Sequence, residues 1–302
     1  MPKGISLNSG AREESDVGSV AVAPIGDSDI DQVGDFLHEN LDRRISARNW
    51  SQSVRPPWSV ESPNHGFMLH EGGRLVGVYL AFYSERTIAG RNERFCNLAA
   101  WCVVPKYRLH GLKLLNALLG QSGYHFTDLS PSGNVIPLNR RLGFEDLDTA
   151  TALMPNLLWP TWPGRYRISS DPAFIESVLA GPELQIYRDH RRARAAKHLV
   201  MIHRGQHCYV IFRRDRRKDL PVFASVLYVS NPSLFQRMAA VFGRHVLLHH
   251  GIPLTLLELR IVGGQPAGSL RLSSSRPKMF KSASLRADQI DNLYSELVCV
   301  AW

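Results

Sequence analysis

The sequence predicts a mixed α/β fold in which two similar units follow one another along the chain. Apolar residues make up 44% of the 302 residues and charged residues 21%, a composition typical of globular proteins rather than disordered chains. The same order of elements (helix, hairpin, strand, helix, strand) is expected in both halves. Between the halves, residues 158–164 read Leu-Trp-Pro-Thr-Trp-Pro-Gly, and the two prolines and the glycine interrupt regular structure there.

The chain is expected to begin with a polar tail and then a helix. Residues 1–18 have no periodic apolar face, so we expect them to be disordered. Residues 29–41 are predicted to be helical, because Ser28 can cap the helix and apolar residues recur at helical spacing. Residues 43–57 are polar and end in prolines, which predicts an irregular segment with room for one short helix.

The first unit, residues 19–158, continues as a sheet with helices between its strands. Its hairpin is expected at Glu71-Gly72-Gly73-Arg74, where a turn sequence separates two apolar runs. The strand after the hairpin is apolar and is therefore expected at the centre of the sheet. In order, we expect strands at 67–70, 75–84 and 94–104, a loop at 105–110, a helix at 111–120, a strand at 125–129, a helix at 134–142 and a strand from residue 143.

The second unit, residues 159–302, is predicted to repeat this order. Its long helix begins after Asn231, which can cap it, and Pro232 suits the first helical position. In order, we expect helices at 172–179 and 183–196, a hairpin of 198–203 and 207–213, a strand at 220–229, the helix at 232–250, strands at 255–261 and 277–283, and a helix at 286–298.

Charge is divided unevenly between the two units. The net charge is +9, but residues 1–158 carry 15 basic and 17 acidic residues, against 21 and 10 in residues 159–302. Two basic clusters lie in the second unit, at 188–194 and 213–218. Such clusters attract nucleic acid or acidic ligands, but without interleaved aromatic residues they are more typical of a solvated helix end and hairpin loop.

Cysteine content and hydropathy exclude other classes of protein. The four cysteines form no CxxC pair, which is typical of a reducing cytosol, and no stretch has the ~20 apolar residues of a membrane span. The first residues lack a signal-peptide core. His245 and His249 are spaced for a metal but have no accompanying acid. We therefore expect a cytoplasmic protein with no metal site and no membrane partner, the sequence does not favour a nucleic-acid partner, and it leaves a homo-oligomer open.

The strongest chemical signal lies where the central strand runs into the next helix. Residues 102–113 read Cys-Val-Val-Pro-Lys-Tyr-Arg-Leu-His-Gly-Leu-Lys. The first N–H groups of a helix lack internal partners and carry the positive end of its dipole, so they bind anions such as a pyrophosphate. Gly111 would let this backbone approach a ligand, and Arg108 and Lys113 add positive charge. A plain strand–helix connection with a glycine cap explains the same residues without a ligand.

Two motifs in this region resemble those of the GNAT N-acetyltransferase superfamily. Residues 103–113 are similar to its acyl-CoA loop, (Q/R)xxGx(G/A), with Arg108 and Gly111 at the first two motif positions. Residues 134–144, Asn-Val-Ile-Pro-Leu-Asn-Arg-Arg-Leu-Gly-Phe, are similar to its later helix that ends in Leu-Gly-Phe. The resemblance covers roughly residues 20–150, and the second half looks like a diverged copy.

The resemblance implies an acyl-CoA-dependent N-acyltransferase, with acetyl-CoA as donor and a small-molecule amine as acceptor. In such proteins the central strand separates from the next strand and pantetheine enters the gap. A neutral amine attacks the thioester directly, backbone N–H polarises the carbonyl, and a base removes the proton of the ammonium. The resemblance implies that the backbone of Trp101, Cys102 and Val103 contacts pantetheine, and that Arg108, Leu109, His110, Gly111, Leu112 and Lys113 contact the pyrophosphate.

The sequence departs from the family pattern at several positions. Lys113 stands where the loop usually ends in Gly or Ala, and Asn97 matches the position of a glutamate base on the central strand. Asn139 stands where many relatives have a tyrosine that acts as the general acid. An amide cannot donate a proton to the leaving thiolate, so we expect Asn139 to have no part in binding or turnover. Ser132 replaces a cofactor-contacting asparagine, a role that Asn134 can take.

Asp128 is the first candidate for the missing base, because it lies on the strand after the cofactor helix. His110 and His125 are alternatives, and each of the three residues also has an ordinary structural explanation as a strand-end cap, a surface residue or a strand start. Residues 228–234 occupy the place of the acyl-CoA loop in the second unit, but they lack the motif and contain Pro232, so only the first unit is expected to bind CoA.

Three functions stay open at this stage. The first is the N-acyltransferase, and the second is O-acylation or the transfer of a longer acyl chain. The third is a non-catalytic protein that senses acyl-CoA or associates with nucleic acid through the basic second unit.

Overall fold

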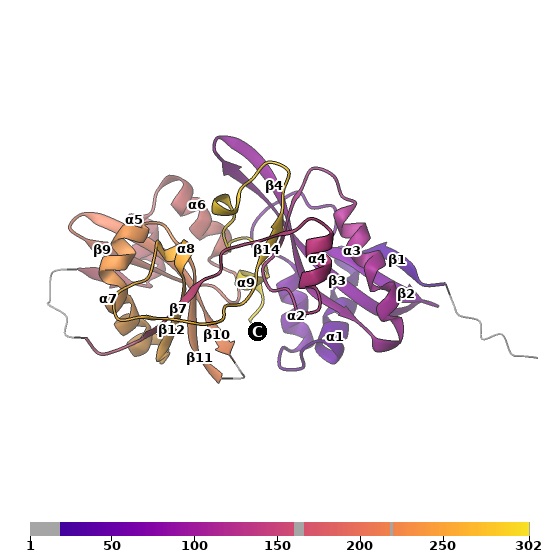
Figure 1. Ribbon diagram of the computed structural model, residues 1–302, viewed down its shortest axis with the longest axis horizontal. Coiled ribbons are helices and arrows are strands. Elements are labelled where there is room, and N and C mark those ends of the chain that lie inside the picture. Colours follow the sequence, from indigo (N-terminus) through magenta and orange to yellow (C-terminus); the bar gives the residue numbers. More distant parts are fainter. Residues whose placement is uncertain (1–18, 160–165, 218–219, 302) are drawn as a thin grey trace, which may run out of the picture.

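The chain folds into two seven-stranded mixed sheets, as a computed structural model that describes residues 19–159, 166–217 and 220–301 shows. The two halves lie side by side along the long axis of the molecule (Figure 1). The predicted disordered tail, residues 1–18, and most of the predicted boundary at 158–164 lie outside the described residues.

The first sheet has the strand order β1-β2-β3-β4-β5-β14-β6, in which β4 and β5 are parallel. The predicted hairpin and central strand are present, and the short edge strand β1 was not predicted. The strands from the first half are β1 (Ala21–Pro24), β2 (Gly66–Glu71), β3 (Arg74–Ile88), β4 (Arg91–Val103), β5 (His125–Asp128) and β6 (Glu145–Asp146).

Helices cover both faces of this sheet because the side chains of β3 alternate between them. On one face, Val78, Leu80 and Phe82 pack with the helices α1 (Ile30–Asn40) and α2 (Ala47–Val54). On the other face, Tyr79, Ala81 and Tyr83 pack with α3 (Gly111–Leu119), and α4 (Ile136–Arg141) packs against the same apolar cluster. The central strands are therefore buried on both faces, as their apolar sequence predicts.

The second sheet repeats this arrangement with the strand order β8-β9-β10-β11-β12-β7-β13. Its core joins β10 to α7 on one face, and to α5 and α6 on the other. The elements are β8 (Arg167–Ser169), α5 (Pro172–Val178), α6 (Gly181–His190), β9 (Lys197–His203), β10 (Gln206–Arg217), β11 (Leu220–Val229), α7 (Pro232–His250), β12 (Leu254–Glu258), α8 (Leu259–Val262) and β13 (Leu270–Arg271).

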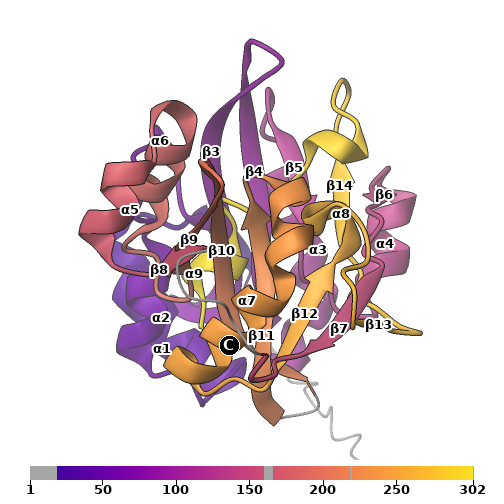
Figure 2. The same ribbon diagram turned by 90° about the vertical axis from the view of Figure 1, so that its left-hand side faces the viewer.

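The two halves exchange one strand each. The sixth strand of the first sheet, β14 (Met279–Lys281), comes from the end of the chain and pairs with β5 and β6. The sixth strand of the second sheet, β7 (Thr151–Pro155), comes from the first half and pairs with β12 and β13, beside which it lies in Figure 2. The sheets therefore interlock, and a division of the chain at residue 158 does not separate their strands.

Four predicted elements differ clearly in the structure, and one of them, the helix predicted at 183–196, ends at His190 as α6. Residues 105–110 form a 3-10 helix (η2, Pro105–His110) rather than a loop, because nothing after Pro105 breaks a helix. The strand predicted to reach residue 261 ends at Glu258, and α8 follows. The helix predicted at 286–298 is wrong: Tyr294 has a φ of +55°, which a helix cannot contain, so only η3 (Ala287–Gln289) and α9 (Glu296–Cys299) form.

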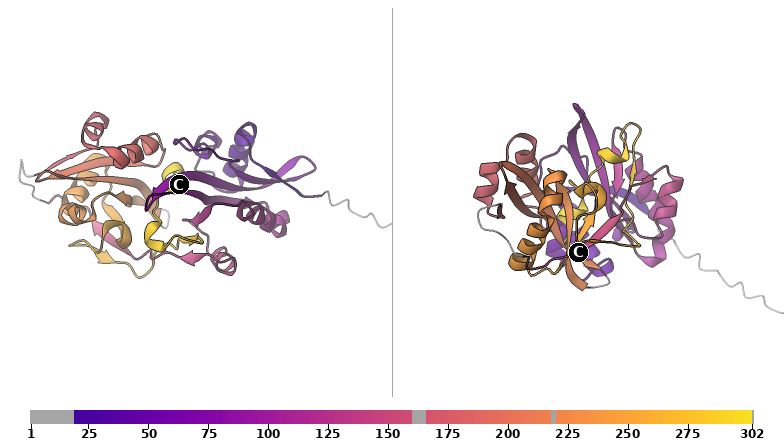
Figure 3. Two further views of the ribbon diagram at one scale, coloured as in Figure 1. Left: turned by 90° about the horizontal axis from the view of Figure 1, so that it is seen from above. Right: turned by 60° about the vertical axis from the view of Figure 1, so that its left-hand side comes forward.

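The C-terminal segment that carries α9 lies between the two halves, as the yellow ribbon in Figures 1 and 3 shows. Leu297, Val298 and Cys299 belong to the apolar cluster that also contains residues of α1, α2, α5 and α6. Within the described ranges, no helix has the length and apolar character needed to cross a membrane.

Candidate active site

The parallel strands β4 and β5 separate partway along β4. Their register runs from Phe95 opposite His125 to Leu98 opposite Asp128, where the pairing stops. β4 continues to Val103, whereas β5 ends at Asp128 and its other edge is taken by β14. In the described chain, residues 99–103 thus have no strand on this side, and their backbone groups can hydrogen-bond to a ligand.

A β-bulge turns β4 at the point of separation. Val78 faces Cys102 and Leu80 faces Ala99, so Ala100 and Trp101 together oppose one residue of β3. Ala100 has a φ of +50°, a left-handed conformation that is uncommon for alanine. Such bulges redirect side chains next to functional sites. Here the indole of Trp101 stacks on Tyr79, with ring centroids 4.7 Å apart.

A cavity of about 690 Å³ lies between the two sheets at this position. Residues 98–101 of β4 and 128–132 after β5 form one wall. The second sheet forms the other wall, mainly through β10, β11 and β12, and α9 contributes Leu297. The strands β11 and β12 also separate here, since their pairing stops at Ser225 opposite Leu256. Both strand separations therefore face one cavity.

Asp128 lines this cavity at the end of β5 and is only 4% exposed. Burial, followed by the negative charge of Glu296, raises the pKa of Asp128 to about 7. A hydrogen bond from Asn139 Nδ2 to Asp128 Oδ2, 2.9 Å long, opposes this rise in pKa. A carboxylate with a pKa near neutrality is suited to accept a proton at physiological pH.

Glu296 is the second buried carboxyl group of this region, and the sequence analysis missed it. Burial raises its pKa, and Ser130 Oγ donates a hydrogen bond of 2.6 Å to its Oε1. Its backbone N–H donates to Asn97 Oδ1 over 3.1 Å. Asn97 on β4 thus holds the C-terminal segment that carries Glu296. A lone acidic residue in the apolar run Glu296–Cys299 was the signal available in the sequence.

Asn139 has a different environment from the one that the sequence analysis expected. Its side chain is fully buried, and its hydrogen bond to Asp128 makes it a positioning residue for that carboxylate. The Oδ1 atom of Asn139 has no hydrogen-bond partner among the described residues.

The residues predicted to bind pyrophosphate lie at the junction of η2 and α3, outside the lining of the cavity. The amide of Gly111 already donates to the Arg108 carbonyl, and Lys113 Nζ donates to the Val20 carbonyl over 3.2 Å. No side chain caps the start of α3. Exposure varies: Gly111 is buried, His110 is half-buried, and Arg108, Leu109, Leu112 and Lys113 are exposed.

Gly111 adopts an ordinary helical conformation, with a φ of −55°. Backbone freedom is therefore not what this position requires. A Cβ atom here would lie 3.3 Å from Trp101 Cζ2 and 3.5 Å from Val103 Cγ2. The absence of a side chain instead lets α3 approach the free edge of β4.

Of the remaining residues predicted to bind the cofactor or act as the base, some line the cavity and others lie outside it. Trp101 lines the cavity, and Cys102 is buried, which raises the pKa of its thiol to about 11, as expected for a small core residue. Asn134 is exposed and outside the lining, whereas Ser132 is part of it. The His125 ring contacts Glu93 at 2.9 Å and Ser282 at 2.8 Å, a structural role, and His110 does not line the cavity.

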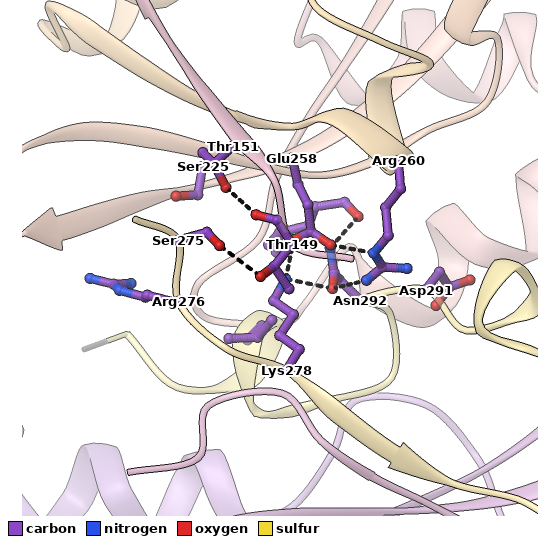
Figure 4. A network of polar contacts seen from close by, with 12 residues as sticks. Thr149, Thr151, Ser225, Glu258, Arg260, Ser275, Arg276, Lys278, Asp291 and Asn292 are labelled. Carbon is purple, nitrogen blue, oxygen red and sulfur yellow. Dashed lines mark hydrogen bonds and ion pairs between the residues drawn. The ribbon is translucent and has the colours of Figure 1, made fainter. Parts of the chain in front are cut away.

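A polar network covers the opposite wall of the cavity (Figure 4). Lys278, which is buried, donates to Glu258 and to Asn292 Oδ1, the latter over 2.7 Å. Arg260 donates to the same two residues. Burial would raise the pKa of Glu258, but Lys278 and Arg260 hold this pKa below its usual value. Lys278 and Arg260 thus offset the negative charge of Glu258. Because Lys278 lies just before β14, the same contacts hold that segment against the second sheet.

The corresponding junction in the second half does not offer the same anion site. Asn231 caps α7, because its Oδ1 accepts a hydrogen bond of 3.0 Å from the Leu234 amide. Pro232, at the first helical position, has no N–H to donate. Among the residues that the structure describes, no group of three or more His, Cys, Asp or Glu side chains is arranged to hold a metal ion.

No protein-family model matches the sequence, and no curated protein matches it either. Solved structures do match its fold. The GCN5-related N-acetyltransferase from Anabaena variabilis has a TM-score of 0.54 at 13% identity, covering 87% of this chain and 72% of that one. The GCN5-related N-acetyltransferase from Kribbella flavida has a TM-score of 0.53 at 14% identity, covering 87% and 71%.

A third structure matches nearly the whole chain. The N-myristoyltransferase from Saccharomyces cerevisiae with bound myristoyl-CoA has a TM-score of 0.51 at 11% identity and covers 99% of this chain and 91% of that one. The chain therefore has the GNAT acyltransferase fold, with two GNAT-like units in tandem, and the predicted fold class is confirmed.

Proposed function

We propose that this protein is an acyl-CoA-dependent N-acyltransferase that transfers an acyl group directly to a small-molecule amine, with acetyl-CoA as the expected donor. One observation carries the proposal: β4 separates from β5 at Leu98, and the buried carboxylate of Asp128 lies at that point, facing the cavity. The likeness in fold to acetyltransferases, and to a protein holding myristoyl-CoA, supports a CoA-linked donor.

The free edge of β4 suits the pantetheine arm of the donor. Backbone groups of Trp101, Cys102 and Val103 have no strand partner on this side in the described chain. Pantetheine carries amide groups that can satisfy them. The thioester supplies the activated acyl group, and the same backbone can donate to its carbonyl oxygen as negative charge develops there.

Asp128 is the proposed general base. An amine acceptor enters mostly as an ammonium, which cannot attack a carbonyl until it loses a proton. Asp128 Oδ1 is the oxygen not bonded to Asn139, and we assign it to receive that proton. Neutral amine then attacks the thioester carbon, and the CoA thiolate leaves and takes up the second proton that the nitrogen loses as the amide forms. A protein that only senses acyl-CoA would need no buried carboxylate at this position.

The donor should bind at one site per chain. The start of α3 lacks a side-chain cap, whereas the equivalent donors of α7 are used by Asn231 or missing at Pro232. Calorimetric titration with acetyl-CoA should therefore give about one equivalent per chain. Two equal sites would contradict the assignment, as would the absence of any heat of binding together with no CoA-thiol release against amines, amino acids and amino sugars.

Replacing Asn139 by alanine should change the pH dependence of turnover. The hydrogen bond from Asn139 lowers the pKa of Asp128, so its loss should raise that pKa above its present value of about 7. The acid limb of kcat/KM should then move to higher pH, while the affinity for CoA stays unchanged. An unshifted limb would show that Asn139 does not act through Asp128.

A further inference from the structure

The charged side chains that line the cavity are not balanced. Five are basic and three are acidic: Arg44, Arg213, Arg216, Arg276 and Lys278 against Asp128, Asp215 and Glu258. Arg44 pairs with Asp42 at 2.8 Å, and Lys278 pairs with Glu258. The three remaining arginines share Asp215 as their neighbouring carboxylate in the lining.

Asp215 is fully committed to its neighbours. Arg213 Nη2 lies 3.1 Å from its Oδ1, and Arg276 Nη1 lies 2.9 Å from both of its oxygens. Ser225 Oγ donates to Oδ2 over 2.6 Å, and the Arg216 amide donates to Oδ1. Burial alone would raise the pKa of Asp215, but Arg213 and Arg276 hold it well below its usual value. Among the cavity-lining residues, one negative charge therefore faces two arginines, and outside the lining Glu296 adds a carboxyl group whose pKa Arg213 lowers.

Arg216 adds a third positive charge to this cluster. It lies on β10 and lines the cavity, and the carboxylate whose pKa its charge lowers, Asp42, is already paired with Arg44. Arg276 is next to it, because its Nη2 donates to the Arg216 carbonyl, and half of the Arg276 side chain is exposed. Arg276 already uses both Nη atoms on Asp215 and on the Arg216 carbonyl, so the donors open to a ligand are mainly those of Arg216, whose guanidinium makes no hydrogen bond to the described residues.

Unbalanced positive charge in a partly enclosed cavity is unfavourable until an anion offsets it. A guanidinium presents paired N–H donors that match the two oxygens of a carboxylate. The arginines come from β10 and the segment before β14, whereas the predicted pyrophosphate residues of η2 and α3 do not line this cavity. An anion bound by these arginines would therefore be distinct from a pyrophosphate bound at the predicted residues of η2 and α3.

We propose that Arg216 and Arg276, supported by Arg213 and Asp215, bind a carboxylate of the acceptor, so that the acceptor is an amino acid or another amine with an amino-acid-like head group. The amine part of this inference rests on the proposed function. Asp128 and the free edge of β4 line the same cavity, so one molecule can present its amine there and its carboxylate to the arginines.

Equilibrium binding tests the carboxylate site without turnover. The probes are the standard L-amino acids and their amides, each titrated into the full-length protein by calorimetry. The amide keeps the amine and the side chain and removes only the negative charge. The best-binding acid should bind at least about tenfold more tightly than its amide. If no acid binds, or if acid and amide bind equally, the inference is wrong.

Two variants of the same strand locate the effect. Arg216→Gln should bring the affinities of acid and amide to within about twofold. Arg214→Gln removes the same charge from an exposed neighbour that donates to the His250 carbonyl on the α7 side, and it should leave the preference intact. Arg216→Gln that instead weakens CoA binding would assign these arginines to the donor and overturn the proposal.

The same panel in the CoA-thiol release assay separates this inference from the proposed function. Release with acids and with decarboxylated amines at equal kcat/KM would keep the acyltransferase and reject the carboxylate site. Selective binding of acids with no release from any acceptor would keep the site and reject the acyltransferase.

Discussion

Replacing Asp128 by asparagine should lower kcat by at least about 100-fold, the scale of a lost general base. Asparagine has nearly the same shape and can still accept the hydrogen bond from Asn139, but it cannot take a proton from an ammonium. Because the substitution leaves the β4 edge unchanged, the affinity for acetyl-CoA should stay within about twofold. Thiol release and calorimetry measure the two quantities.

A pH series gives this prediction its control. Asp128 acts as a base only when ionised, so kcat/KM of the wild-type protein should rise as the pH passes through about 7. Glu296→Gln removes a negative charge that raises the pKa of Asp128, so the same limb should move to lower pH. Near-normal turnover of Asp128→Asn would show that the base is another residue. So would an acid limb of kcat/KM that does not move when Glu296 is replaced.

The elements that local sequence determines were predicted well. Helix α7 has a capping Asn231 and a proline at its first position, and both act as expected. The hairpin of β2 and β3 turns at the predicted glycines, of which Gly72 and Gly73 have positive φ. The residues that determine each of these elements lie within a few positions of one another, so the local sequence was sufficient to predict them.

The pairing of strands with distant partners was not predicted: β7 was not expected, and β14, expected as a strand at 277–283, joins the first sheet rather than the second. β7 and β14 are each a few residues long, and each is stabilised by strands from the other half of the chain. Nothing in a stretch of five or three residues tells which sheet it joins. The same is true of Glu296, whose importance comes from its contacts with Asn97 on β4 and Ser130 after β5, more than a hundred positions earlier in the chain.

The candidate site shows the same division. Asp128 was a candidate from its place on a predicted strand, and the structure adds burial, a cavity and a second carboxyl group. The loop expected at 105–110 is a 3-10 helix, so the argument for Gly111 changes from backbone freedom to the space between α3 and β4. Its role in cofactor binding stays a prediction.

Gly111→Val should weaken acetyl-CoA binding by at least about tenfold, or ~1.4 kcal/mol. The new Cβ would lie 3.3 Å from Trp101 Cζ2 and 3.5 Å from Val103 Cγ2, and the two branched methyl groups would reach further. Both neighbours belong to the edge of β4 that we assign to pantetheine. Pushing them outward moves this edge, and with it the stack of Trp101 on Tyr79. Calorimetry measures the affinity.

Two other variants grade this effect. In Gly111→Ala the Trp101 side chain has to move by only a few tenths of an ångström. This variant should therefore bind CoA more tightly than Gly111→Val. Arg108→Ala should weaken binding less than Gly111→Val, because an exposed charge is screened by water and salt. A melting temperature recorded for each variant separates lost affinity from the general cost of overpacking. If folded Gly111→Val binds acetyl-CoA as the wild type does, the donor does not lie along β4, and the basic wall of the second sheet becomes the place to look for its site.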